Sequence, residues 1–82
     1  MTRIMMSLFD KKAGSYGQPF FVVSNGAAFR SIGDELRRGG DDNVLAKHPS
    51  DFELYVVGSF DDVTAELKAE KSFLCNVESL KE

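Results

Sequence analysis

The sequence predicts an α+β fold in which a small antiparallel sheet of four to five strands has one helix packed on it. Segments with alternating apolar side chains lie both before and after one strongly amphipathic segment, and glycine-rich or aspartate-rich turns separate them. The chain has 82 residues, which corresponds to a single domain over 1–82, because typical domains have about 100–150 residues. Strands on both sides of one helix in the sequence favour an antiparallel sheet with the helix on one face.

Residues 3–9 form the first predicted strand. Ile4, Met6 and Leu8 point to one face, and the side chains between them, which are also largely apolar, point to the other. A strand that is apolar on both faces is expected at the centre of a sheet or covered on both sides. After a glycine-rich loop over 10–19, the aromatic and β-branched residues 20–23 predict a second, short strand.

Residues 24–38 form the predicted helix. Ser24 or Asn25 can cap its N-terminus, and an apolar stripe that runs from Ala28 to Leu36 at helical spacing should face the sheet. Gly39 follows two arginines, which is typical of a helix C-terminus. A glycine inside a helix costs about 1 kcal/mol relative to alanine, so Gly33 predicts a close backbone contact.

Residues 39–51 predict a long polar connection without regular structure, and residues 52–60 predict a strand. Alternation places Phe52, Leu54, Val56 and Phe60 on one face of that strand. A glycine inside a strand is typical of a bulge or of a close backbone approach, so Gly58 predicts one of these.

Residues 61–71 allow two interpretations. As a strand, they show apolar side chains alternating from Val63 to Ala69 after a turn at Asp61 and Asp62. As a helix, they begin with an aspartate N-cap and continue with strong helix formers. The strict alternation directly after a strand favours the hairpin. Residues 72–77 predict a final short strand or a segment that docks on the domain, and residues 78–82 are expected to fray.

The composition excludes several classes of protein. No apolar run approaches the about 18 residues of a membrane span, so we expect no membrane partner. The early charged residues are unlike a signal peptide, and a single Cys75 excludes an intrachain disulfide and fits a reducing compartment. The net charge of −3 argues against a strongly basic nucleic-acid coat. Charge is uneven, however, because residues 1–48 carry seven cationic side chains against five anionic ones.

Little in the sequence points to catalysis. His48 is the only histidine and lies in a polar loop, where a role in a turn is favoured, and the apolar surroundings of Cys75 favour a buried thiol over a reactive one. Together these two residues cannot supply four zinc ligands. The adjacent carboxylates at 41–42 and 61–62 are typical of turns. We therefore expect no enzymatic activity and no cofactor.

The remaining candidate site is an aromatic and basic cluster on or near the first two strands. Its members are Arg3, Lys11, Lys12, Tyr16, Phe20, Phe21 and Arg30. Aromatic rings flanked by cations are a common way to hold single-stranded nucleic acid, because each stacked base contributes about 1–3 kcal/mol and the phosphates add a salt-dependent term. The alternative is that the two phenylalanines belong to the core and that the lysines are merely solvated.

Three stretches of the chain resemble one protein family. They are KAGSYGQPFF at 12–21, AAFRSIGDEL at 27–36 and HPSDFELYVVGSFDD at 48–62. Together they resemble the small non-structural protein of gokushovirus-like microviruses, which are single-stranded DNA phages, and the His-Pro-x-Asp-Phe-x-Leu-Tyr stretch is the most specific part. The family often has Thr-Gly after the aspartate turn, whereas this chain has Thr64-Ala65. Alanine disfavours positive φ, so this departure weighs against the left-handed residue that the family pattern implies there.

The resemblance implies a phage protein that is absent from the mature virion and acts in genome replication in the host bacterial cytoplasm. We therefore predict a replication accessory protein that binds single-stranded DNA through the aromatic and basic cluster. The alternative is a non-enzymatic protein-interaction module that modulates a host or viral replication protein without contacting DNA. A thin core and a first strand that is apolar on both faces also predict a homodimer.

Overall fold

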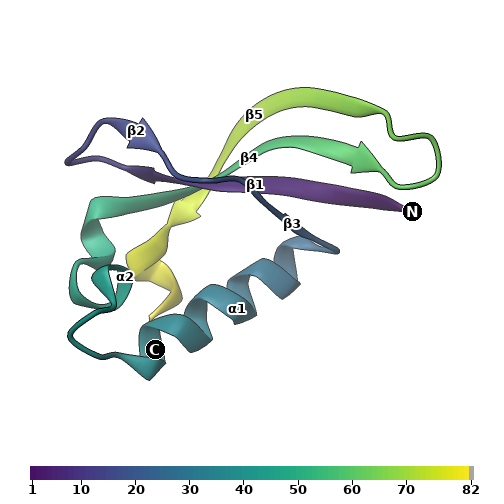
Figure 1. Ribbon diagram of the computed structural model, residues 1–82. Coiled ribbons are helices and arrows are strands. Elements are labelled where there is room, and N and C mark those ends of the chain that lie inside the picture. Colours follow the sequence, from purple (N-terminus) through teal and green to yellow (C-terminus); the bar gives the residue numbers. More distant parts are fainter. Residues whose placement is uncertain (82) are drawn as a thin grey trace.

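The computed structural model describes residues 1–81 and contains a five-stranded antiparallel sheet. Its strands are β1 (Thr2–Asp10), β2 (Ser15–Tyr16), β3 (Phe20–Val22), β4 (Phe52–Asp61) and β5 (Leu67–Asn76). The order is β2-β1-β4-β5, and β3 also pairs with β1 on the side of β2. Figure 1 shows the sheet above the helix α1 (Asn25–Arg38). The predicted α+β fold is confirmed, and β1 is a central strand.

The core lies between the sheet and α1. Ala28, Ile32 and Leu36 are buried on the helix and meet the fully buried Met6 of β1 and Leu54 of β4. The apolar stripe read from the sequence therefore faces the sheet as predicted. Each of these side chains contributes roughly 1.5–3 kcal/mol by leaving water, except the smaller alanine. Within the described residues, no helix packs on the opposite face of the sheet.

The ends of α1 follow the sequence signals. The Ser24 hydroxyl oxygen accepts a hydrogen bond from the Ala27 amide at 3.1 Å, which satisfies one of the free amides at the N-terminus. Gly39 follows the helix with a φ of 66°, in the region that favours glycine. Gly33 is buried, and a Cβ built on it would lie 3.4 Å from the Leu80 carbonyl oxygen, so the predicted close contact is present.

The connection over 39–51 is more regular than predicted. It contains the one-turn helix α2 (Val44–Lys47) and the 3-10 helix η1 (Pro49–Asp51). Asn43 organises this segment, because its side-chain oxygen accepts from the Ala46 amide and its side-chain nitrogen donates to the Glu35 carbonyl at 2.9 Å. Periodicity needs several turns to be detected, so one-turn helices were missed.

The segment after β4 forms a hairpin with it, so the strand interpretation that the sequence favoured over the helix is confirmed. The turn covers residues 62–66, and β5 then runs without interruption from Leu67 to Asn76. The prediction of a separate strand over 72–77 was wrong, because Leu67–Asn76 form one continuous strand and Val77 begins the next helix. Residues 78–82 were expected to fray, yet Glu78, Ser79 and Leu80 belong to the 3-10 helix η2 (Val77–Leu80), which begins at the fully buried Val77. Residue 82 lies outside the described residues.

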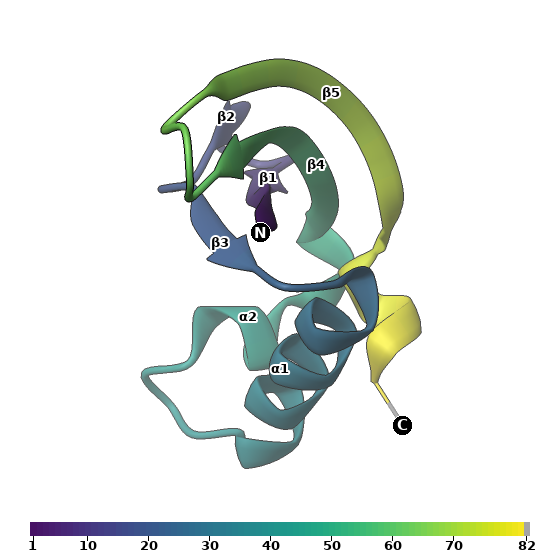
Figure 2. The same cartoon turned by 90° about the vertical axis from the view of Figure 1, so that its right-hand side faces the viewer.

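Register irregularities bend the sheet at two levels. At the first, β1 inserts no residue, β4 inserts Val57, and β5 inserts residues 70 and 71. At the second, β5 inserts Leu74 between the partners of Leu54 and Tyr55. The extra residues lengthen the outer strands, so the sheet curls, and Figure 2 shows β5 arcing around β4 with β1 near the centre. The bulge predicted from Gly58 is therefore confirmed.

The same bulge reverses the side-chain alternation at the end of β4. Leu54 faces the core, but beyond Val57 the partner of Phe60 is Arg3 and the partner of Ser59 is Ile4. The prediction that Phe60 shares a face with Leu54 was therefore wrong. One inserted residue moves every later side chain to the other face of a strand.

The turn between β4 and β5 contains a strained residue. Ala65 has a φ of 64°, and its amide donates to the Asp61 carbonyl at 2.7 Å. The Asp61 carboxylate accepts from the Val63 amide at 2.8 Å and from the Thr64 amide, and these two hydrogen bonds hold the pKa of Asp61 below its usual value. The left-handed position that alanine disfavours is thus present in this chain.

We expect Ala65→Gly to stabilise the protein by about 1 kcal/mol. A left-handed conformation costs a residue with a Cβ roughly 1–2 kcal/mol, and the greater freedom of glycine in the unfolded chain offsets part of the gain. Chemical denaturation midpoints measure the difference. Ala69→Gly in the exposed part of β5 is the control and should destabilise, so equal losses for both variants would contradict the argument.

Candidate functional site

Four aromatic rings, one from each strand of the β2-β1-β4-β5 path, meet on the sheet face opposite α1. We call the surface formed by Phe9, Tyr16, Tyr55 and Phe73 the aromatic face. Strand register brings them together, because Phe9 pairs with Tyr16 and Tyr55 pairs with Phe73. The ring centroids of Phe9 and Tyr16 are 4.7 Å apart. The ring centroid of Tyr55 lies 5.4 Å from that of Tyr16 and 5.6 Å from that of Phe73.

Lys71 of β5 lies over the aromatic face. Its Nζ donates a hydrogen bond to the Tyr16 hydroxyl at 3.3 Å, and it lies 5.5 Å from the Tyr16 ring centroid and 5.8 Å from that of Tyr55. Both distances are within the range of cation–π attraction. Tyr16 and Lys71 come from the two end strands of the path, so this contact links β2 to β5 across the curled sheet.

The aromatic face is partly exposed and has Glu53 beside it. Tyr16 is 41% exposed and Phe73 is 48% exposed, which leaves ring surface available to a ligand. The Tyr55 hydroxyl donates to Glu53 Oε1 at 3.5 Å. Burial raises the pKa of Tyr55, with the Glu53 charge as the next cause, so the phenol remains neutral and can donate hydrogen bonds near pH 7.

A second aromatic pair lies on the same side of the sheet, toward the other end of β1. The ring centroids of Phe21 and Phe60 are 5.8 Å apart, and Phe21 is about half exposed. Arg3 is the β1 residue paired with Phe60. Its Nε lies 3.5 Å from the Asp62 carboxylate, so its charge is partly compensated within the chain.

The structure brings together only part of the predicted aromatic and basic cluster. Tyr16 and Phe21 lie on the open side of the sheet, while Lys11 and Lys12 are exposed in the turn between β1 and β2. Phe20 pairs with Met6 and packs against the core on the helix side. Arg30 lies on the exposed side of α1. The last two residues are therefore on the other side of the sheet from Tyr16.

Sequence reasoning missed Phe9, Tyr55, Phe73 and Lys71 as site residues. A signal was present for Tyr55, because alternation in 52–60 places it opposite Leu54 and hence away from the core. Lys71 could not be assigned, since residues 61–71 were ambiguous between strand and helix, and Phe73 lay in a separate predicted segment over 72–77 whose partner strand the sequence does not indicate. Only the pairing of β5 with β4 shows that both side chains reach Tyr55.

The other residues singled out in the sequence have structural roles here. The His48 amide donates to the Val44 carbonyl at 2.9 Å and ends α2, and the His48 carbonyl accepts from the Asp51 amide at 3.0 Å. Cys75 packs against the core, and burial raises the pKa of its thiol, as expected for an unreactive cysteine. Among residues 1–81, no group of histidine, cysteine and carboxylate side chains is suited to hold a metal ion.

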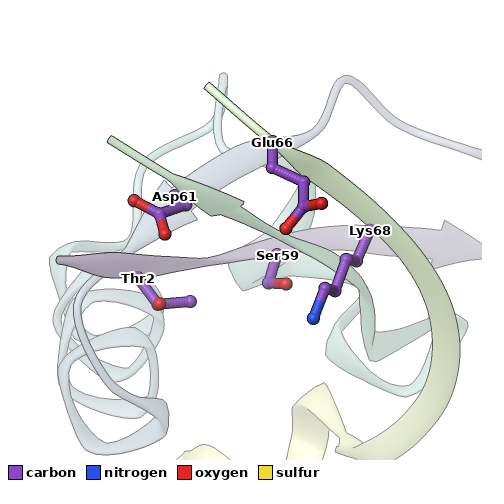
Figure 3. A pocket seen from close by; sticks show the side chains of 5 residues that line it. All are labelled: Thr2, Ser59, Asp61, Glu66 and Lys68. Atoms are coloured by element: carbon purple, nitrogen blue, oxygen red, sulfur yellow. The ribbon is translucent and has the colours of Figure 1, made fainter. Parts of the chain in front are cut away.

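Two hollows in the surface lie away from the aromatic face. The smaller one has a volume of about 70 Å³ and is lined by the polar side chains of Thr2, Ser59, Asp61, Glu66 and Lys68 near the end of the hairpin (Figure 3). This volume holds a few water molecules and no nucleotide. The other, of about 500 Å³, is an open depression between the β1–β2 turn and η2, where Lys11 and Glu78 bring opposite charges.

Comparison with known proteins places the chain in a family. Residues 3–80 match the family described as Phage ORF5 protein. The chain belongs to this family. No curated protein and no solved structure matches the chain. The resemblance to a phage protein is thus confirmed at the level of a phage protein family, and none of the helices in residues 1–81 is long and apolar enough to cross a membrane.

Proposed function

We propose that this Phage ORF5 family member is an accessory protein of phage genome replication that binds single-stranded DNA on the aromatic face. The observation that carries the proposal is the set of four contacting rings on a sheet face that no helix of residues 1–81 covers, with the Lys71 ammonium within 6 Å of two of them. Aromatic side chains on an open sheet are a recurring platform for stacking unpaired bases.

The cations around this face can meet phosphates. Lys71 lies on the aromatic face itself, and Lys11 and Lys12 are exposed in the turn that joins β1 to β2, next to Tyr16 in the hairpin. Three phosphate contacts to a single strand give a slope of log affinity against log salt of about −2. Arg3 contributes less, since Asp62 already compensates its charge.

Membership in a phage family and the resemblance to microvirus non-structural proteins support the proposed setting. A small DNA-binding protein of a single-stranded DNA phage would act in the host bacterial cytoplasm, where replicating genomes expose single strands. The proposal needs no enzymatic activity and no cofactor. The role of Tyr16, Phe21, Lys11 and Lys12 proposed from the sequence is kept, whereas Phe20 and Arg30 are left out because they lie on the other side of the sheet.

We expect affinity for a labelled 30-mer of oligo-dT at 50 mM salt that falls with the predicted slope as salt rises. Tyr16→Leu removes the stacking ring but keeps an apolar side chain, and it should weaken binding by about 5- to 150-fold, which corresponds to about 1–3 kcal/mol per stacked base. Tyr16→Phe keeps the ring and should bind within a few fold of the parent protein. Fluorescence anisotropy measures all three affinities.

Two substitutions of cationic residues, one on the aromatic face and one on α1, give a matched comparison. Lys71→Ala should weaken binding and make the salt slope shallower by about 0.7, whereas Arg30→Ala on the exposed side of α1 should change neither. Duplex DNA of equal length hides its base faces and should bind less tightly than oligo-dT. If no binding occurs at 50 mM salt and high micromolar protein, the DNA proposal fails and a protein-interaction module takes its place.

A further inference from the structure

Strand β5 leaves one long edge of the sheet unpaired. It has ten residues and lies at the end of the strand order, and none of residues 1–81 pairs with its outer edge. The opposite edge is different, because two short strands of two and three residues cover β1 there, with Pro19 directly before the second. A long free edge exposes a row of backbone donors and acceptors that can pair with another strand.

We propose that β5 pairs antiparallel with β5 of a second copy of this chain, centred on Ala69, so that the two sheets join into one. This proposal is independent of DNA binding. The exposure of the segment fits it, since residues 67–73 are all exposed, and Leu67, with 63% of its surface exposed, is a large apolar side chain in the paired region. Strands that pair in this way place the two copies around a two-fold axis.

The charges of β5 select the register. A two-fold axis perpendicular to the sheet keeps each side chain on its own face, so residues equally far from the centre lie opposite each other. With Ala69 at the centre, Lys68 lies opposite Glu70 of the second copy, and the symmetry repeats this ion pair. Moving the centre by one residue instead places Lys68 against Lys68, or Glu70 against Glu70.

The two charged side chains are available for this pairing. Among residues 1–81, neither Lys68 nor Glu70 forms an ion pair within the chain. Lys68 pairs with Ser59 of β4, and Figure 3 shows its side chain on the same side of the hairpin as Ser59. Lys71 lies over the aromatic face, so its neighbour Glu70 points to the opposite face, which is the face of Lys68 and Ser59. On the other face, Leu67 lies opposite the aliphatic stem of Lys71 of the second copy.

Charge reversal tests the register directly. In the absence of DNA, sedimentation equilibrium at up to several hundred micromolar should show the parent protein reaching twice its mass of 9.1 kDa. Lys68→Glu and Glu70→Lys each replace two ion pairs with two repulsions, so each should weaken the dimer by about tenfold or more. An equimolar mixture of these two variants restores both pairs and should form a heterodimer, and the double variant should form a homodimer again.

Lys47→Glu on α2 is the matched control, because it reverses an exposed cation away from β5 and should leave the dimer unchanged. Circular dichroism confirms that each variant is folded. A parent protein that is monomeric throughout overturns the proposal. A dimer that both single reversals leave intact, or that the mixture of variants does not restore, shows a different interface and also overturns it. Neither result bears on the affinity for oligo-dT.

Discussion

Leu54→Ala is expected to destabilise the protein by about 2–5 kcal/mol, because it removes buried methyl groups and leaves a cavity that the core fills only partly. Leu54 is fully buried on β4 and belongs to the small core cluster with Met6 and Val77. A chain of this size has a folding free energy of about 4–12 kcal/mol, so this single change removes much of it. Chemical denaturation followed by circular dichroism gives the free energy of unfolding.

Leu67→Ala is the matched control for that prediction. It makes the same change in the neighbouring strand, but Leu67 is mostly exposed in the monomer. We expect a loss below about 1 kcal/mol when the measurement is made at low micromolar concentration. Comparable losses for Leu54→Ala and Leu67→Ala would contradict the placement of the core on the helix side of β4.

Gly58→Ala is the second substitution for which we expect a large loss of stability, and here the cause is a clash with the backbone. A Cβ built on Gly58 collides with the Lys68 carbonyl oxygen of β5, where β4 and β5 change register. A carbonyl in a strand ladder cannot turn aside as a flexible side chain can, so the strands must separate locally. We expect a loss of about 3 kcal/mol, at the upper end of the cost of overpacking.

Gly26→Ala provides the comparison. The nearest atom to a Cβ on Gly26 is the Ser24 hydroxyl oxygen at 3.9 Å, and the residue lies in the first turn of α1. Alanine is the better helix former by up to about 1 kcal/mol, so this change should be neutral or stabilising. Thermal unfolding of both variants measures the contrast, and a Gly58→Ala protein as stable as its parent would mean that the two strands lie further apart.

The fold could be predicted from local patterns, and its departures from prediction arise from long-range pairing. The cap at Ser24 and the stripe from Ala28 to Leu36 act within one helix, so the sequence alone indicates them. Val57 is different, because an insertion into β4 is defined only relative to β1 and β5. The position of Phe60 depends on that insertion, and no alternation within residues 52–60 can reveal it.

The candidate site was predicted in part for a related reason. Tyr16 stood out because a loop rich in glycine and lysine surrounds it. Its ring partners Phe9, Tyr55 and Phe73 come from three other strands, and they meet only through register. Phe20 was grouped with Phe21 because the two are adjacent, yet adjacent residues in a strand face opposite sides. The sheet therefore separates what the sequence places together.

Titration of oligo-dT into the ring-labelled protein, followed by nuclear magnetic resonance, tests the central claim most directly. If bases stack on the aromatic face, the ring signals of Phe9, Tyr16, Tyr55 and Phe73 should shift together with saturation. The rings of Phe20 and Phe29, which pack against the core on the helix side, should remain in place. Shifts confined to those two rings, or no shifts at saturating oligonucleotide, would contradict the assignment of the aromatic face as a surface for single-stranded DNA.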